Sequence, residues 1–131
     1  MEQNEKTKAL LAAFGCALAY LLAGKALTAV LPQVPEEAAR MWALVHRCAA
    51  APIVEELVFR GIIQQLARPL GERQAVALQA VLFAVQHRGP AGMAYALVCG
   101  LVLGTLRSRT GSVWPGMLLH TLNNLLVFAA G

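Results

Sequence analysis

Charged residues are scarce in this chain, and their scarcity excludes an ordinary water-soluble domain. Only 14% of its 131 residues are Asp, Glu, Lys or Arg and 58% are hydrophobic, whereas soluble domains carry about 25% charge. Aromatic residues make up 6% and the net charge is +4, so the basic, aromatic-rich surface typical of nucleic-acid binding is missing. We therefore predict an integral membrane protein whose partner is the lipid bilayer, with no nucleic-acid partner.

The chain also lacks the usual signatures of metal and redox sites. Its three cysteines, Cys16, Cys48 and Cys99, lie far apart in or beside apolar runs, so they form neither a CxxC motif nor a zinc ribbon. The HExxH motif is absent, which excludes a zincin site of the soluble type.

What the chain does have is long hydrophobic stretches separated by prolines, glycines and charges. They predict an all-α, polytopic transmembrane bundle with a polar intramembrane cavity. The expected helices, about five in number, cover residues 9–31, 38–66, 74–87, 91–107 and 113–129. The first is interpreted as a retained transmembrane helix, because its start is polar and includes acids and its apolar run is too long for a signal peptide. The third and fourth are short for a span of about 20 residues.

Two further patterns concern assembly and orientation. Gly100 and Gly104 form a GxxxG face, which indicates close helix packing either within the bundle or across a homo-oligomer. Lysines and arginines are more numerous on the side that carries the N-terminus, which predicts a cytoplasmic N-terminus in the plasma membrane.

Polar residues inside the hydrophobic stretches recur at the spacing of one helical turn. The pairs are Glu56 with Arg60, Phe83 with His87, and His120 with Asn124, and Glu55 lies directly beside the first. Residues at i and i+4 share a helix face, and ionisable groups in an apolar helix require a partner or a wet cavity. Because adjacent positions differ by about 100°, Glu55 and Glu56 are expected not to point at the same place. Arg60 can neutralise Glu56, whereas Glu55 needs a partner on another helix.

These residues fit two ways of activating water. In the first, Glu55 and His87 hold and deprotonate a water that attacks an amide, while His120 and Asn124 stabilise the oxyanion. In the second, Glu55, His87 and His120 bind a divalent metal such as zinc. We favour the first scheme, with no cofactor, because Asn is a poor zinc ligand and a good oxyanion donor.

Three motifs in this order resemble those of a known family. Pro52-Ile-Val-Glu-Glu-Leu-Val-Phe-Arg-Gly61, Phe83-Ala-Val-Gln-His87 and His120-Thr-Leu-Asn-Asn124 are similar to the EExxxR, FxxxH and HxxxN motifs of the CPBP family. This family comprises the CAAX-protease and bacteriocin-processing (Abi) intramembrane proteases, with the Rce1-type endopeptidases among them. The resemblance covers about residues 44–131, and the chain is shorter than the family's usual members.

The resemblance implies a role for each motif residue. Glu55 corresponds to the catalytic base and His87 assists the water. Glu56 with Arg60 supports the site, and Phe83 positions His87. His120 with Asn124 forms the oxyanion site.

From the residues and the resemblance together we expect a membrane-embedded endopeptidase that cuts a membrane-associated peptide or protein of the CAAX or leader/bacteriocin type. The alternative is a non-catalytic immunity protein that binds a peptide in the same cavity. The expected division of the chain is an N-terminal transmembrane helix at 1–34 and a CPBP-like catalytic bundle at 38–131.

Overall fold

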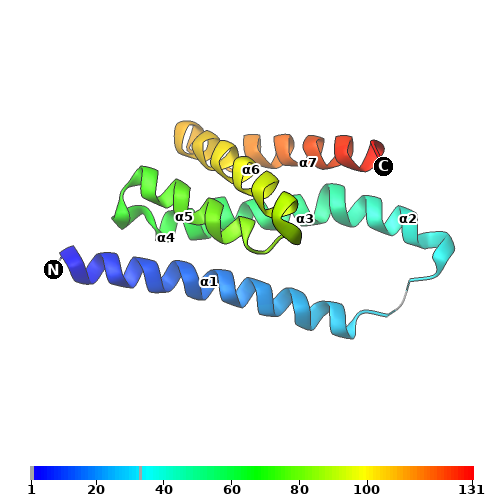
Figure 1. Ribbon diagram of the computed structural model, residues 1–131, viewed down its shortest axis with the longest axis horizontal. Helices are drawn as coiled ribbons and strands as arrows, with labels where there is room; N and C mark the ends of the chain where they lie inside the picture. The colour runs from blue at the N-terminus through cyan, green and yellow to red at the C-terminus, as the bar shows by residue number, and fades with distance from the viewer. Residues whose placement is uncertain (1, 33) are drawn as a thin grey trace.

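The computed structural model describes residues 2–32 and 34–131, and within them it contains helices and no strands. In chain order the elements are α1 (Glu2–Val30), α2 (Glu36–Val45), η1 (His46–Ala50), α3 (Ala51–Glu55), η2 (Glu56–Ile63), α4 (Gln64–Leu66), η3 (Arg68–Leu70), α5 (Glu72–Ala84), α6 (Gly89–Thr110) and α7 (Trp114–Ala129). The segments from α2 to α4 follow one another without a break and form one helix over 36–66 (Figure 1). The predicted all-helical bundle is thereby confirmed.

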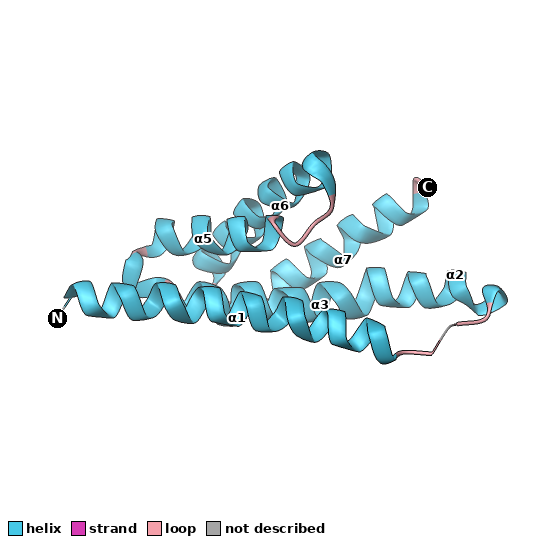
Figure 2. Ribbon diagram, turned by 60° about the horizontal axis from the view of Figure 1, so that its bottom comes forward, coloured by secondary structure: helices cyan, strands magenta, loops and turns pink. Residues whose placement is uncertain are grey.

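Helix 36–66 is the central element of the bundle. It contacts α1, α5, α6 and α7 along its length. In Figure 1, α1 runs along the lower edge and helix 36–66 returns above it in the opposite direction. The N-terminus before α1 and the C-terminus after α7 lie towards opposite ends of the long axis. Figure 2 shows α6 rising away from α1, with α5 between them. The central helix is therefore the one from which a side chain can meet all the others.

The ends of α1 and α5 differ from the predicted ones. α1 begins at Glu2, ahead of the apolar run, because Lys6 pairs with Glu2 and Lys8 pairs with Glu5 across its first turns. The prediction that the third helix reaches residue 87 is wrong, since α5 ends at Ala84. The chain leaves α5 through a tight turn, and that turn places His87 outside the helix.

α6 is longer than predicted at both ends. Pro90 lies in its first turn, where no N–H is needed. Its C-terminus reaches Thr110 and is closed by Gly111, whose φ of 70° is a left-handed conformation that glycine adopts without strain. At 22 residues, α6 is long enough to cross a bilayer, which corrects the expectation of a short helix.

Helix 36–66 contains two segments wound as π-helix, η1 and η2. At the end of η1 the N–H of Ala51 binds the carbonyl of His46, five residues earlier. In the same register residue 52 would donate to the carbonyl of Arg47, but Pro52 has no N–H. The Arg47 carbonyl therefore needs a donor from outside its own helix. Wide turns of this kind frequently occur at functional sites.

The two glycines of the GxxxG face pack against α5 of the same chain. A Cβ at Gly100 would lie 2.9 Å from the backbone of Ala80, and one at Gly104 would lie 2.3 Å from the side-chain nitrogen of Gln79. The Gln79 amide donates to the Gly100 carbonyl at 2.7 Å. The face thus joins α6 to α5 within the bundle, and a homo-oligomer through Gly100 and Gly104 would have to displace α5.

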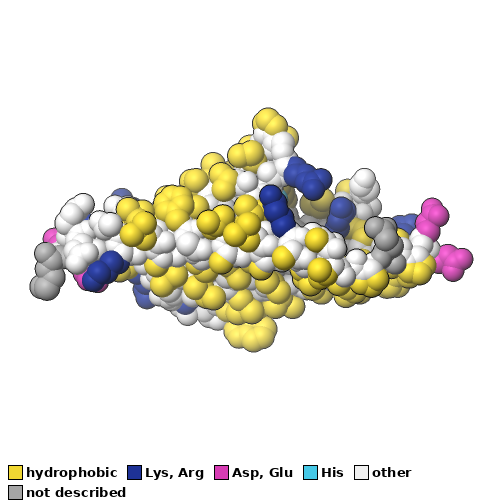
Figure 3. Space-filling view, turned by 90° about the horizontal axis from the view of Figure 1, so that it is seen from below, with side chains coloured by type: hydrophobic (Ala, Val, Ile, Leu, Met, Phe, Trp, Pro, Cys, Tyr) yellow, Lys and Arg dark blue, Asp and Glu magenta, His cyan; other side chains and the backbone are white. Residues whose placement is uncertain are grey.

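The exterior of the bundle is apolar. Leu11 is 69% exposed and Leu126 is 72% exposed, and hydrophobic side chains cover much of the face shown in Figure 3, with acidic residues at the ends. α1 and α6 are each long and apolar enough to cross a membrane. An apolar surface of this extent is typical of contact with lipid.

Candidate active site

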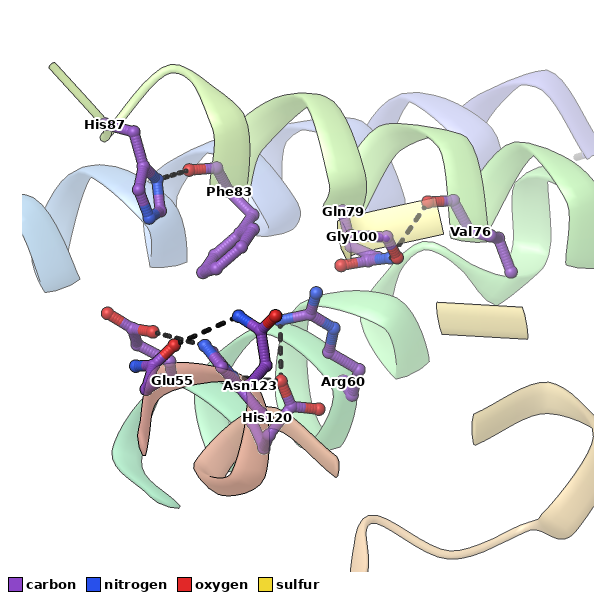
Figure 4. A network of polar contacts seen from close by, with 11 residues as sticks. Glu55, Arg60, Val76, Gln79, Phe83, His87, Gly100, His120 and Asn123 are labelled. Atoms are coloured by element: carbon purple, nitrogen blue, oxygen red, sulfur yellow. Dashed lines mark hydrogen bonds and ion pairs between the residues drawn. The ribbon is translucent and has the colours of Figure 1, made fainter. Parts of the chain in front are cut away.

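Residues from all three motifs line one open cavity of about 820 Å³. Helix 36–66 contributes Glu55, α5 contributes Phe83, the turn after α5 contributes His87, and α7 contributes His120 and Asn124. Figure 4 shows the ring of Phe83, from α5, and the ring of His87, from the turn after it, pointing towards His120 on α7. The structure thus brings together residues that lie up to 69 positions apart in the sequence.

The imidazole of His120 lies between the two neighbouring glutamates. Its Nδ1 is 2.9 Å from Oε1 of Glu56, and its Nε2 is 3.5 Å from Oε2 of Glu55. As expected of adjacent helix positions, the two carboxylates point to different places, here two edges of one ring, and Glu55 finds its partner on another helix, α7. The carboxylates differ in access, since the side chain of Glu55 is 20% exposed and that of Glu56 is fully buried.

Arg60 provides the buried positive charge beside Glu56. Its Nη1 lies 3.0 Å from Oε1 of Glu56, and both side chains are completely buried. The guanidinium also lies over the ring of Phe83, with its central carbon 4.5 Å from the ring centroid. The predicted pairing of Glu56 with Arg60 is present, and it holds Glu56 away from the cavity.

Phe83 contacts both histidines and is itself held by a neighbouring ring. Its ring centroid is 4.7 Å from that of His87 and 5.9 Å from that of His120, both edge to face, and Phe59 packs against it at 5.1 Å. The Phe83 carbonyl lies 3.0 Å from Nδ1 of His87. That carbonyl accepts from Nδ1–H, which leaves Nε2 of His87 available to the cavity.

Asn124 makes a contact that the motif did not predict. Its side-chain amide donates to the carbonyl of Arg47 at 2.8 Å, the same carbonyl that Pro52 leaves without a helical donor. Asn124 therefore ties α7 to η1 at the cavity. An Asn amide carries two N–H groups, so this bond uses one and leaves the other.

Comparison with known proteins identifies one family. Residues 37–126 match the family described as type II CAAX prenyl endopeptidase Rce1-like. The chain belongs to this family. No curated protein and no solved structure gave a significant match. Membership makes the chain a membrane-embedded protease of the CAAX type, which acts on a peptide or protein substrate in the membrane.

In this Rce1-like protein the residues of the metal alternative do not form a compact cluster. Across residues 2–32 and 34–131, no three His, Cys, Asp or Glu side chains are grouped closely enough to hold one ion. His87 and His120 both have Nδ1 against a protein oxygen, so each offers only Nε2.

The sequence reasoning missed Tyr95 and assigned no role to Asn123. Tyr95 on α6 lines the cavity and donates its hydroxyl to the side-chain oxygen of Asn123, and Asn123 in turn donates to the oxygen of Asn124 at 3.4 Å. A chain of hydrogen bonds thus runs from α6 through α7 to η1. A lone tyrosine in an apolar helix does not indicate such a chain of hydrogen bonds, but a second asparagine within the HxxxN motif does.

Gly116 is a third residue that the motifs do not reveal. It lies one turn before His120 on the same face of α7, and a Cβ there would come within 2.8 Å of Oε2 of Glu56. The absence of a side chain therefore lets α7 approach the buried carboxylate closely enough for His120 to reach it.

Proposed function

We propose that this Rce1-like protein is a multi-pass endopeptidase of the plasma membrane in which Glu55 activates the attacking water. The observation that carries the proposal is the contrast between the two glutamates. Both contact His120, but Glu56 is buried in an ion pair with Arg60, whereas Glu55 faces a cavity large enough for a peptide. Of the two glutamates, Glu55 is therefore the one that can contact a water beside a substrate.

The proposed reaction needs four side chains. Glu55, with His87 opposite, holds the water and takes its proton as the oxygen attacks the scissile carbonyl carbon. Nε2 of His120 and the remaining N–H of Asn124 stabilise the oxyanion. The tetrahedral intermediate then collapses as the C–N bond breaks, and Glu55 passes its proton to the leaving amine.

Glu56 and Arg60 support this reaction without contacting the substrate. The carboxylate of Glu56 accepts from Nδ1–H of His120 and so fixes the ring with Nε2 towards the cavity. Arg60 pairs with the same oxygen of Glu56 and so holds that carboxylate in place against the ring.

The test is cleavage of a farnesylated peptide ending in a CAAX sequence by protein reconstituted in liposomes. Glu55→Gln preserves shape but cannot accept the proton, so we expect cleavage to fall at least about 100-fold while the thermal unfolding midpoint stays within a few degrees. Full activity of the variant would contradict the proposal. A peptide that binds without being cut by the wild-type protein would favour the immunity alternative.

The same assay tests the metal alternative. Under the proposed mechanism, a chelator leaves the cleavage rate unchanged and added zinc does not raise it. A rate that disappears with the chelator and returns only with a divalent ion would instead assign Glu55, His87 and His120 to a metal.

A further inference from the structure

The charged side chains that line the cavity are unevenly distributed. Among the lining residues the structure describes, Glu55 is the one carboxylate side chain, whereas Arg40, His46 and Arg47 bring basic groups to one end. Neither arginine forms an ion pair anywhere in residues 2–32 and 34–131. An unpaired cation in the wall of a cavity favours an anionic ligand over a neutral one.

Arg47 is the better positioned of the two arginines. Its carbonyl accepts the hydrogen bond from Asn124, and the Tyr95–Asn123 contact supports Asn124 from α6. Three helices therefore fix the backbone from which the Arg47 side chain extends. Arg40 lies two turns earlier on α2, where no described side chain bonds to its backbone.

The spacing between Arg47 and Glu55 corresponds to a short length of peptide. They lie eight positions apart on one helix, which is about 12 Å at 1.5 Å per residue. An extended peptide covers about 3.3–3.6 Å per residue, so three or four residues reach from Glu55 to Arg47. Arg40, fifteen positions from Glu55, lies about 22 Å away and corresponds to six or seven residues.

We propose that Arg47 binds the free C-terminal carboxylate of the substrate, three or four residues beyond the bond that is cut. This inference rests on the proposed function. The guanidinium offers two parallel N–H donors to a carboxylate, and apolar residues that line the same cavity, among them Ala96, Val127 and Phe128, can contact the side chains of the residues between. Arg47 thus selects substrates whose chain ends close to the cleavage site.

The experiment compares two farnesylated CAAX peptides that differ only at the C-terminus, one with a free carboxylate and one amidated. Both are assayed with wild-type protein, Arg47→Gln and Arg47→Lys in liposomes. With wild type, we expect amidation to raise KM about tenfold or more, because a charge-assisted contact is lost. Arg47→Gln should raise KM for the free acid by the same factor as amidation does, and it should leave KM for the amide unchanged. Arg47→Lys should recover part of the loss, since it keeps the charge but not the fork.

Arg40→Gln is the matched control, since it removes the same charge from the same cavity at a greater distance from Glu55. We expect it to leave KM for the free acid within about twofold. An equal rise in KM for both peptides in Arg47→Gln would overturn the proposal, because it would assign Arg47 to lipid or to the fold.

An amidated peptide with Asp as its last residue separates the two sources of a carboxylate. If the wild-type protein cleaves it as well as the free acid, an acidic side chain is the ligand and the terminal assignment is wrong. These outcomes are distinct from failure of the proposed function, which would appear as undiminished cleavage by Glu55→Gln.

Discussion

At His120, the two nitrogens of one ring meet two carboxylates of different character. The glutamate at Nδ1 is sealed with Arg60, and the one at Nε2 faces the cavity. In the proposed mechanism, these consecutive residues therefore take separate tasks: Glu56 orients the ring, and Glu55 meets the substrate. The difference comes from their surroundings, burial and the Arg60 partner, since the two side chains are chemically identical.

The buried pair allows a stability prediction. Glu56→Ala leaves the Arg60 guanidinium buried without its partner, and we expect it to lower the free energy of unfolding by about 3–5 kcal/mol. The double variant Glu56→Ala/Arg60→Met removes both charges and should recover most of that loss. Denaturant unfolding in detergent micelles measures both. A double variant less stable than the single one would show that the pair does not act in this way.

The bond from Asn124 to the Arg47 carbonyl gives a second prediction at this scale. In Asn124→Ala the carbonyl loses its donor, and we expect a loss of about 1 kcal/mol in the free energy of unfolding. Pro52→Ala supplies an N–H to the same carbonyl from within the helix. Asn124→Ala should therefore cost markedly less in the Pro52→Ala background, and strictly additive effects in this double-mutant cycle would contradict the anchoring role.

Among the elements, α7 depends on a glycine for its position. Gly116→Ala places a methyl group 2.8 Å from Oε2 of Glu56, so we expect a loss of about 1–3 kcal/mol in the free energy of unfolding and weakened cleavage. Gly92→Ala is the matched control on α6, because a Cβ there meets nothing within 4 Å. We expect it to be neutral or slightly stabilising. Equal unfolding midpoints in the two variants would contradict the close approach of α7.

The element scale also shows what the sequence could predict. The periodic polar pairs placed Glu55, His87 and His120 on three separate helices, and the structure lines one cavity with all three. The end of α5 was misjudged, because His87 leaves the helix in a turn, where its Nδ1 contacts the Phe83 carbonyl. The Arg47 carbonyl could not be predicted as the partner of Asn124 either, because it lacks a helical donor only where a π-helical turn is followed by Pro52.

At the scale of the whole molecule, α1 lies outside the matched family region yet packs into the same core. Ala13 is fully buried, and the ring of Tyr20 contacts Phe59 edge to face at a centroid distance of 5.4 Å. The division into an N-terminal transmembrane helix at 1–34 and a catalytic bundle at 38–131 stays a prediction. In the structure, α1 packs against the central helix.

A pair of adjacent substitutions tests the packing of α1. Ala13→Leu forces a larger side chain into a site with no exposed area, and we expect it to lower the free energy of unfolding by about 1–3 kcal/mol. Ala12→Leu makes the same chemical change at an exposed position and should change stability by less than about 0.5 kcal/mol. Thermal unfolding in micelles compares them, and similar effects at the two positions would show that α1 is not packed as described.

The unbroken course of the central helix from residue 36 to residue 66 has a consequence for fidelity. Glu55 and Arg47 both lie on this helix, so the distance between them should stay the same when the bilayer thickens, thins or tilts the bundle. A distance fixed within one helix does not depend on how two separate helices are placed relative to each other. The length of the fragment released from a substrate should therefore be the same in thick and thin membranes, even where the rate of release is not.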